Sequence, residues 1–86
     1  MEDRIPYWVA RGDYEHKFTN QDGEVWFIKE NKVSKTVLVT SNSKRVGYKV
    51  REFKANKVTL PWDLTEEEKA LMHEILKLVD KRFNSR

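Results

Sequence analysis

The most informative absence in this sequence is cysteine, since a chain without cysteine has no disulfide bond, no thiolate zinc site and no cysteine nucleophile. Glycine is scarce as well. Gly12, Gly23 and Gly47 lie far apart, so no glycine-rich phosphate-binding loop exists. The two histidines, His16 and His73, stand alone and do not form a metal-ligand pattern. We therefore expect a protein that is not an enzyme and that carries no metal or other cofactor.

Long apolar runs are also missing. No stretch approaches the roughly 18 apolar residues of a membrane span. Residues 1–13 lack the apolar centre of a secretory signal. These absences predict a soluble protein without a membrane partner. We expect it in the cytoplasm, or, for a protein that acts in a host, in the cytoplasm or nucleoid of the host cell. With 86 residues, the chain is long enough for one small domain.

Positive charge is what the chain has in excess, and its distribution is uneven. The net charge is +3, yet residues 29–57 contain nine Lys or Arg and only two acids, which gives this segment +7. Residues 1–28 carry −3 and residues 58–86 carry −1. Such asymmetry favours an anionic partner. The alternative is a solvated, lysine-rich sheet face that protects the sheet against edge-to-edge pairing.

Alternating apolar residues predict short strands along most of the chain. We expect strands or hairpins at residues 5–11, 14–30, 32–42, 45–53 and 57–60. The segment NQDG (residues 20–23) reads as a hairpin turn, because Gly23 can adopt a positive φ. Pro6 confines the first strand to a sheet edge, because proline cannot donate to a ladder.

The alternation also predicts which side chains share a face of the sheet. The apolar side comprises Val33, Val37, Val39, Val46, Tyr48, Val50 and Val58. The opposite side comprises Arg45, Lys49, Arg51 and Phe53. The apolar side is the surface on which a helix would pack.

Residues 65–84 carry the pattern of an amphipathic helix. Thr65 is the expected N-cap, and Glu68, three residues later, completes a capping box. The apolar face comprises Leu71, Met72, Ile75, Leu76, Val79 and Phe83, widened by Leu78. This face predicts a helix that packs on the apolar side of the sheet and leaves the other side open.

The sequence therefore predicts a single α+β domain, with four or five antiparallel strands and one C-terminal helix packed on one face of the sheet. Residues 1–22 would form an N-terminal strand or hairpin arm, residues 23–60 a basic antiparallel sheet, and residues 65–84 the helix. The basic residues should then lie on the face that the helix does not cover.

Aromatic residues give a second indication of function. Trp26 and Phe53, close to basic residues, are suited to stacking on nucleic-acid bases within a basic groove. Trp26 has an alternative place in the core, because the EVWFIK segment is apolar on both faces. Trp62 follows Pro61 and is expected to close the open end of the core.

The order of the segments GYKVREF, KVTL and LTEEEKALMHEIL resembles the single-stranded-DNA-binding domain of the positive-cofactor-four (Whirly-related) coactivators. The resemblance covers roughly residues 23–81 and implies a role in transcription regulation, carried out by a homodimer that grips single strands across its sheets. Its matching positions here are Lys49, Arg51 and Phe53. The inserted PWD before the helix and the whole of residues 1–22 depart from the family's pattern.

Two hypotheses follow. The first is a small DNA- or RNA-binding protein that uses a basic, aromatic sheet face. Its candidate nucleic-acid-binding residues are Trp26, Lys35, Lys44, Arg45, Lys49, Arg51, Phe53, Lys54 and Lys57. The second is a small phage or mobile-element protein that binds and modulates a host protein or enzyme, using its basic sheet face against an acidic or nucleic-acid-binding surface of that partner.

Overall fold

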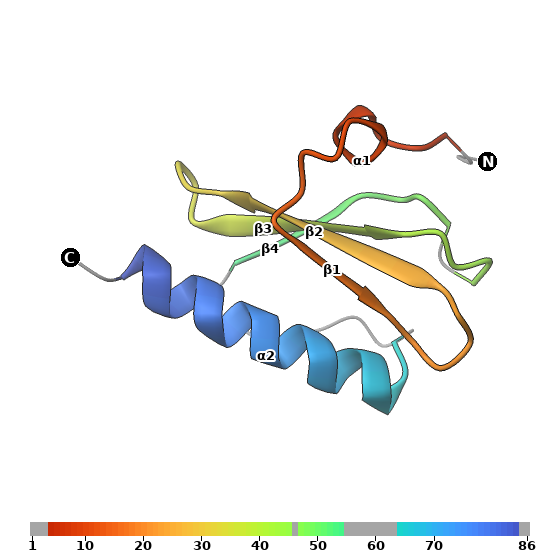
Figure 1. Ribbon diagram of the computed structural model, residues 1–86. Helices are drawn as coiled ribbons and strands as arrows, with labels where there is room; N and C mark the ends of the chain where they lie inside the picture. Colours follow the sequence, from red (N-terminus) through yellow and green to blue (C-terminus); the bar gives the residue numbers. More distant parts are fainter. Residues whose placement is uncertain (1–3, 46, 55–63, 85–86) are drawn as a thin grey trace.

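The fold is a four-stranded antiparallel sheet with a long helix across one face (Figure 1). The computed structural model describes residues 4–45, 47–54 and 64–84. The elements are α1 (Tyr7–Ala10), β1 (His16–Thr19), β2 (Val25–Asn31), β3 (Thr36–Ser41), β4 (Arg51–Lys54) and α2 (Glu66–Phe83). The predicted α+β class, with one C-terminal helix packed on a sheet, is confirmed.

The sheet is a simple meander in the order β1-β2-β3-β4, because each strand pairs with the next one along the chain. The β1–β2 connection is the predicted turn at residues 20–23. There the side chain of Asn20 accepts hydrogen bonds from the backbone N–H groups of Asp22 and Glu24. Gly23 has a φ of 79°, a conformation that glycine adopts without steric cost.

The capping box of α2 is confirmed. The Thr65 hydroxyl accepts a hydrogen bond from the Glu68 backbone N–H at 3.2 Å, and the Glu68 carboxylate accepts one from the Thr65 N–H at 2.9 Å. Three acidic residues occupy the first turn, while Lys81 and Arg82 lie in the last turn. Both placements complement the helix dipole.

The core lies between α2 and the face of the sheet that α2 covers. Strands β2 and β3 and helix α2 supply its buried apolar side chains, together with Leu64. These side chains are Trp26, Ile28, Val37, Val39, Leu64, Met72, Leu76 and Val79. Phe18, Phe53, Ile75 and Phe83 pack around them. The predicted apolar face of the helix is thus confirmed for Met72, Ile75, Leu76, Val79 and Phe83. Leu71 is only half-buried and is not one of the core residues, and Leu78 points to solvent and is 61% exposed.

A buried carboxylate joins the C-terminal end of α2 to the sheet. The Glu30 side chain on β2 is fully buried and accepts two hydrogen bonds from the Arg82 guanidinium, at 2.6 and 2.8 Å. His16 on β1 lies 2.7 Å from the same carboxylate. Since a buried charge is stable only when it is paired, this contact fixes the last turn of α2 over β1 and β2.

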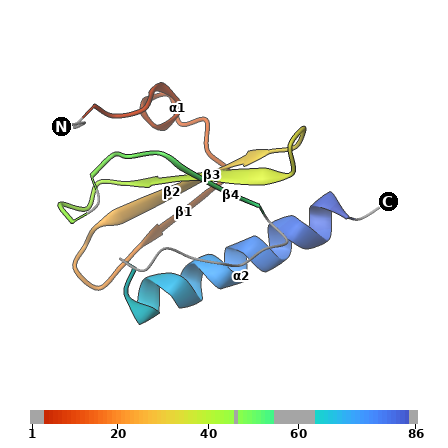
Figure 2. The same cartoon turned by 180° about the vertical axis from the view of Figure 1, so that it is seen from behind.

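The face of the sheet opposite α2 is partly covered by the N-terminal segment (Figures 1 and 2). Trp8 of α1 is only 4% exposed. Tyr14 meets Phe27 edge to face, with ring centroids 4.9 Å apart, and the Lys29 ammonium donates to the Asp13 carbonyl at 2.9 Å. The expectation that this face stays open is therefore wrong for the part under α1.

The predicted first strand at residues 5–11 is wrong, because the chain there forms the single helical turn α1. Pro6 precedes this turn with φ −56° and ψ 145°, and its carbonyl accepts from the N–H groups of Val9 and Ala10. Pro6 is therefore the N-cap residue, with an extended backbone, and the helical turn begins at Tyr7. The residue that suggested an edge strand instead caps a helical turn.

The strand predicted at residues 45–53 is shorter than expected. Strand β4 starts at Arg51, while residues 47–50 form turns and irregular backbone, with Gly47 at a φ of 74°. Tyr48 and Val50 therefore do not extend the core side of the sheet, and Val50 is exposed. Val33 was likewise placed on the core side, but it lies in the β2–β3 turn and is 97% exposed.

Several expectations fall outside the described residues. They concern the short strand at residues 57–60, with Lys57 and Val58, and Trp62 as a plug of the core. Val46 is also outside. Within residues 4–45, 47–54 and 64–84 the sheet has four strands.

The docking of α2 can be tested with two leucines of the same helix. Leu76→Ala should lower the free energy of unfolding by about 2–5 kcal/mol, because Leu76 is fully buried in the core. Leu78→Ala is the matched control and should change it by less than about 0.5 kcal/mol, since that side chain faces solvent. Urea unfolding followed by circular dichroism measures both. Equal losses would contradict the observed face of α2.

Candidate nucleic-acid interface

The register of β4 decides where its predicted binding residues point. Arg51 pairs with Val39 and Phe53 pairs with Val37. Directly paired residues lie on the same face of a sheet, and both valines lie in the core under α2. Arg51 and Phe53 therefore face the helix side, where Phe53 packs against the core. Their predicted place on the uncovered face is wrong.

Trp26 is part of the core. It is 2% exposed, and its ring stacks on Phe18 with centroids 6.0 Å apart and an interplanar angle of 8°. A base cannot reach a ring that is covered in this way. The expectation that Trp26 is a stacking platform is therefore wrong, and the alternative that places it in the core is confirmed.

Arg45 is occupied by an internal ion pair. Its guanidinium donates to the fully buried Glu68 carboxylate at 2.6 Å and lies 3.8 Å from Glu24. Asn20 in the β1–β2 turn donates to the same Glu68 carboxylate. Arg45 thus links the loop after β3 to the N-terminal end of α2 and to the β1–β2 turn, so its main role is to position these elements.

The protonation of this cluster follows from its contacts. Burial alone would raise the pKa of Glu68, but hydrogen bonds from the Thr65 backbone, Arg45 and Asn20 outweigh it and hold the pKa below the ordinary 4.5. The Asn20 hydrogen bond likewise lowers the pKa of Glu24, against the opposing effect of burial. Both carboxylates are therefore charged in the folded protein at neutral pH.

Four of the predicted lysines remain available. Lys35, Lys44, Lys49 and Lys54 are all exposed, and none forms an ion pair with an acid in the described part of the chain. Lys49 stands two residues before β4 and Lys54 ends it, so the two lysines flank this short strand. We call these four residues the lysine rim. Lys44 and Lys49 lie in the loop before β4, Lys54 ends β4, and Lys35 lies in the β2–β3 turn beside that end.

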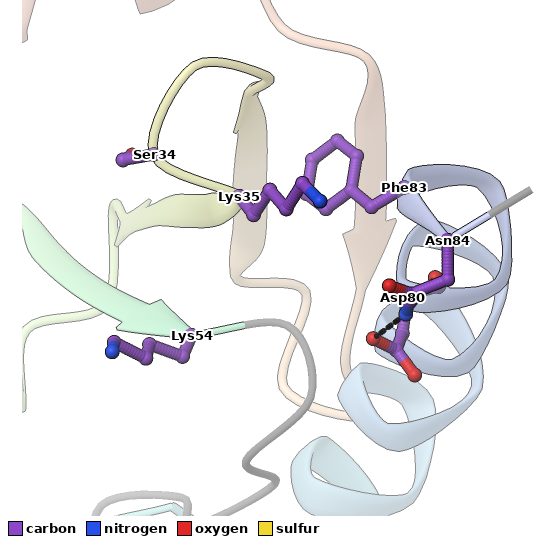
Figure 3. A pocket seen from close by; sticks show the side chains of 6 residues that line it. All are labelled: Ser34, Lys35, Lys54, Asp80, Phe83 and Asn84. Carbon is purple, nitrogen blue, oxygen red and sulfur yellow. Dashed lines mark hydrogen bonds between the residues drawn. The ribbon is translucent and has the colours of Figure 1, made fainter.

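One cleft opens at the end of this rim, between the β2–β3 turn, the end of β4 and the last turn of α2. It has a volume of about 200 Å³. Six residues line it, namely Ser34, Lys35, Lys54, Asp80, Phe83 and Asn84. In Figure 3 the two lysines come from the sheet side of the cleft, and the aromatic ring, the carboxylate and the amide come from the helix.

Sequence reasoning missed the contributions of Phe83 and Asp80 to this cleft. The sequence predicts Phe83 on the apolar face of the helix and gives no role to Asp80, and both side chains are half-buried. Their approach to Lys35 depends on where the helix ends relative to the β2–β3 turn. No local pattern in the sequence encodes that relation.

Metal ligation has no support in the described residues, where no group of three or more His, Cys, Asp or Glu is arranged to hold an ion. Neither helix of the described chain has the length and apolar content needed to cross a membrane.

Comparison with known proteins gave no match to any protein-family model, to any curated protein or to any solved structure. The resemblance to the positive-cofactor-four coactivators therefore stays a prediction that rests on the order of sequence segments.

The Glu68 cluster predicts a loss of stability in acid. A carboxyl whose pKa is lowered by folding stabilises the protein fully above its unfolded pKa, and this stabilisation is lost as the pH falls through the folded pKa. The free energy of unfolding should therefore be constant near neutral pH and fall from about pH 5 downward. Urea unfolding at a series of pH values measures this decline.

Glu68→Gln should lower the stability at neutral pH and make the decline in acid shallower, because the charged partner of Arg45 is lost. Glu74→Gln, a neutral substitution at an exposed position of the same helix, is the control and should leave the profile unchanged. A Glu68→Gln profile parallel to that of the wild type would contradict the role of this cluster.

Proposed function

We propose that this protein is a non-enzymatic nucleic-acid-binding module, and that its lysine rim contacts the phosphates of a single strand. The observation that supports this proposal most directly is the set of four exposed lysines around β4, which make no ion pair with an acid in the described chain. Unpaired lysines can neutralise phosphates without first breaking a contact within the protein.

The different contacts of the lysines and of two arginines support the same function. Arg45 and Arg82 are held by buried carboxylates, and these contacts join α2 to the sheet. Such arginines belong to the fold, because releasing either one would leave a buried charge unpaired. Binding therefore relies on flexible ammonium groups. These act as point charges on phosphates and give no fixed geometry for reading a sequence.

Affinity in this arrangement comes mainly from phosphates. Each phosphate neutralised by a lysine releases counterions, which makes binding strong at low salt and weak at high salt. Such contacts carry no sequence information of their own. The expected partner is therefore single-stranded DNA or RNA bound with little sequence preference along the rim, in the cytoplasm or nucleoid where such strands occur.

The salt dependence of binding tests this function. The double change Lys49→Ala and Lys54→Ala should make the log–log salt slope shallower by about 1.4, which is two single-strand phosphate contacts at about 0.7 each. Fluorescence anisotropy with single- and double-stranded oligonucleotides at several salt concentrations measures the slope. The rim lysines are exposed, so the variant should keep the stability of the wild type.

Lys77→Ala with Lys81→Ala is the matched control, because it removes the same charge from exposed positions on α2. The control should leave the slope nearly unchanged. Equal slopes for the two double variants would show that net charge, and not the rim, sets the affinity. If the wild-type protein binds no oligonucleotide at low salt, the proposal is wrong and docking to a host protein becomes the favoured hypothesis.

A further inference from the structure

We propose that the cleft at the end of the lysine rim holds one nucleotide of the bound strand and prefers a cytosine base. This inference rests on the proposed function, and it adds a base preference to a surface that otherwise reads only phosphates. Three chemically different groups meet in the cleft, namely the Lys35 ammonium, an aromatic ring and a carboxylate, while Lys54 lines the cleft from the end of β4 and its side chain points away from the helix (Figure 3).

The phosphate would be bound on the sheet side. Thr36 and Lys54 are paired in the β3–β4 register, so Lys35, one residue before Thr36, lies next to the end of β4. The turn that carries Lys35 is fixed by hydrogen bonds, because the Asn31 side chain accepts from the backbone N–H groups of Val33 and Ser34. Both lysines are exposed, and their backbones lie on neighbouring segments at the sheet side of the cleft, but only the Lys35 side chain points toward Phe83 (Figure 3). Lys35 is therefore the lysine placed to contact a phosphate at the cleft.

The base would stack on Phe83. This ring is half-buried, packs against the core and also lines the cleft. A ring anchored in this way offers a surface to a base at a small entropic cost, and stacking tolerates any base. Of the rings that sequence analysis proposed for stacking, Trp26 is buried in the core and Phe53 packs against it. Phe53 and Phe83 are both half-buried and packed against the core, but Phe83 is the one that lines this cleft together with Lys35.

Asp80 supplies the base preference. The Asn84 amide donates to one oxygen of its carboxylate at 2.9 Å and to the Asp80 backbone carbonyl at 3.0 Å, which orients the side chain. The other carboxylate oxygen makes no hydrogen bond within the described residues. A carboxylate accepts well from the exocyclic amine of cytosine, whereas thymine presents the O4 acceptor at the same position and would be repelled.

The size of the cleft favours a single base. Its volume of about 200 Å³ is below the usual range of about 300–1,000 Å³ for sites that enclose a whole small molecule. One pyrimidine would fit against the ring, with its sugar and phosphate lying outside the cleft beside Lys35 (Figure 3). The cleft would therefore act as a subsite of a longer strand and not as a pocket for a free nucleotide.

The test compares two single strands of equal length, one of deoxycytidine and one of thymidine, by fluorescence anisotropy at one salt concentration. We expect the cytidine strand to bind about fivefold more tightly, the lower end of the discrimination that a base-edge contact gives. Asp80→Asn should bring the ratio of the two dissociation constants close to one. A ratio is the suitable readout, since loss of a negative charge alone would strengthen binding to both strands equally.

Glu74→Gln is the control, because it removes one negative charge from an exposed position of α2 outside the cleft and should leave the ratio unchanged. Phe83→Leu keeps an apolar side chain against the core and should weaken both strands about fivefold or more, the lower end of what a lost stacking contact gives. Thermal melting of Phe83→Leu verifies that it remains folded at the temperature of the titration.

The outcomes separate the two proposals. Binding of both strands with equal affinity, unchanged by Asp80→Asn, would overturn the cytosine subsite and leave phosphate binding by the rim intact. Absence of binding by either strand would overturn both. A cytidine preference that Asp80→Asn abolishes and Glu74→Gln preserves would support the subsite.

Discussion

The structure depends on two buried carboxylates, one at each end of α2. Glu68 meets Arg45 and Asn20 near the first turn of the helix, and Glu30 meets Arg82 and His16 near the last turn. Removing a carboxylate from water costs several kcal/mol unless its hydrogen bonds are replaced. Each carboxylate therefore requires its partners, and those partners come from different elements. These charged contacts, together with the apolar core, fix the position of α2 on the sheet.

The pairing of these buried carboxylates also determines which cationic side chains can contact a bound ligand. The guanidinium groups of Arg45 and Arg82 complete the buried carboxylates, whereas Lys35, Lys44, Lys49 and Lys54 are exposed and make no ion pair with a described acid. The position of α2 in turn brings Phe83 and Asp80 beside Lys35 and Lys54. The contacts that stabilise the fold are in this way the same contacts that shape the proposed binding surface.

Much of the fold could be predicted because its signals are local. The capping box at Thr65, the apolar stripe of α2 and the turn at Gly23 each depend on a few neighbouring residues, and all three are confirmed. The faces of β4 could not be predicted in the same way. In the structure β4 pairs Arg51 with Val39, which places Arg51 on the core side of the sheet. This register depends on the chain between β3 and β4, and the alternation of residues within β4 does not determine it.

The candidate site was harder to predict than the fold, because charge patterns do not distinguish a free cation from one in an ion pair. Arg45 and Lys44 are neighbours in the sequence, yet Arg45 binds the buried Glu68 while Lys44 is exposed and makes no ion pair with a described acid. The difference arises because the fold brings the loop after β3 close to the start of α2, where Arg45 reaches Glu68 and Lys44 does not.

The two anchors of α2 also have a consequence for the order in which the protein folds. Glu30 and Arg82 are 52 positions apart in the sequence, and Asn20 and Glu68 are 48 apart. The strands pair with their sequence neighbours, so the meander can form by closing short loops, whereas docking of α2 must close long ones. Non-local contacts slow folding. The sheet should therefore form first and expose its apolar face until the helix docks, which makes that interval the step at which the chain is most prone to aggregate.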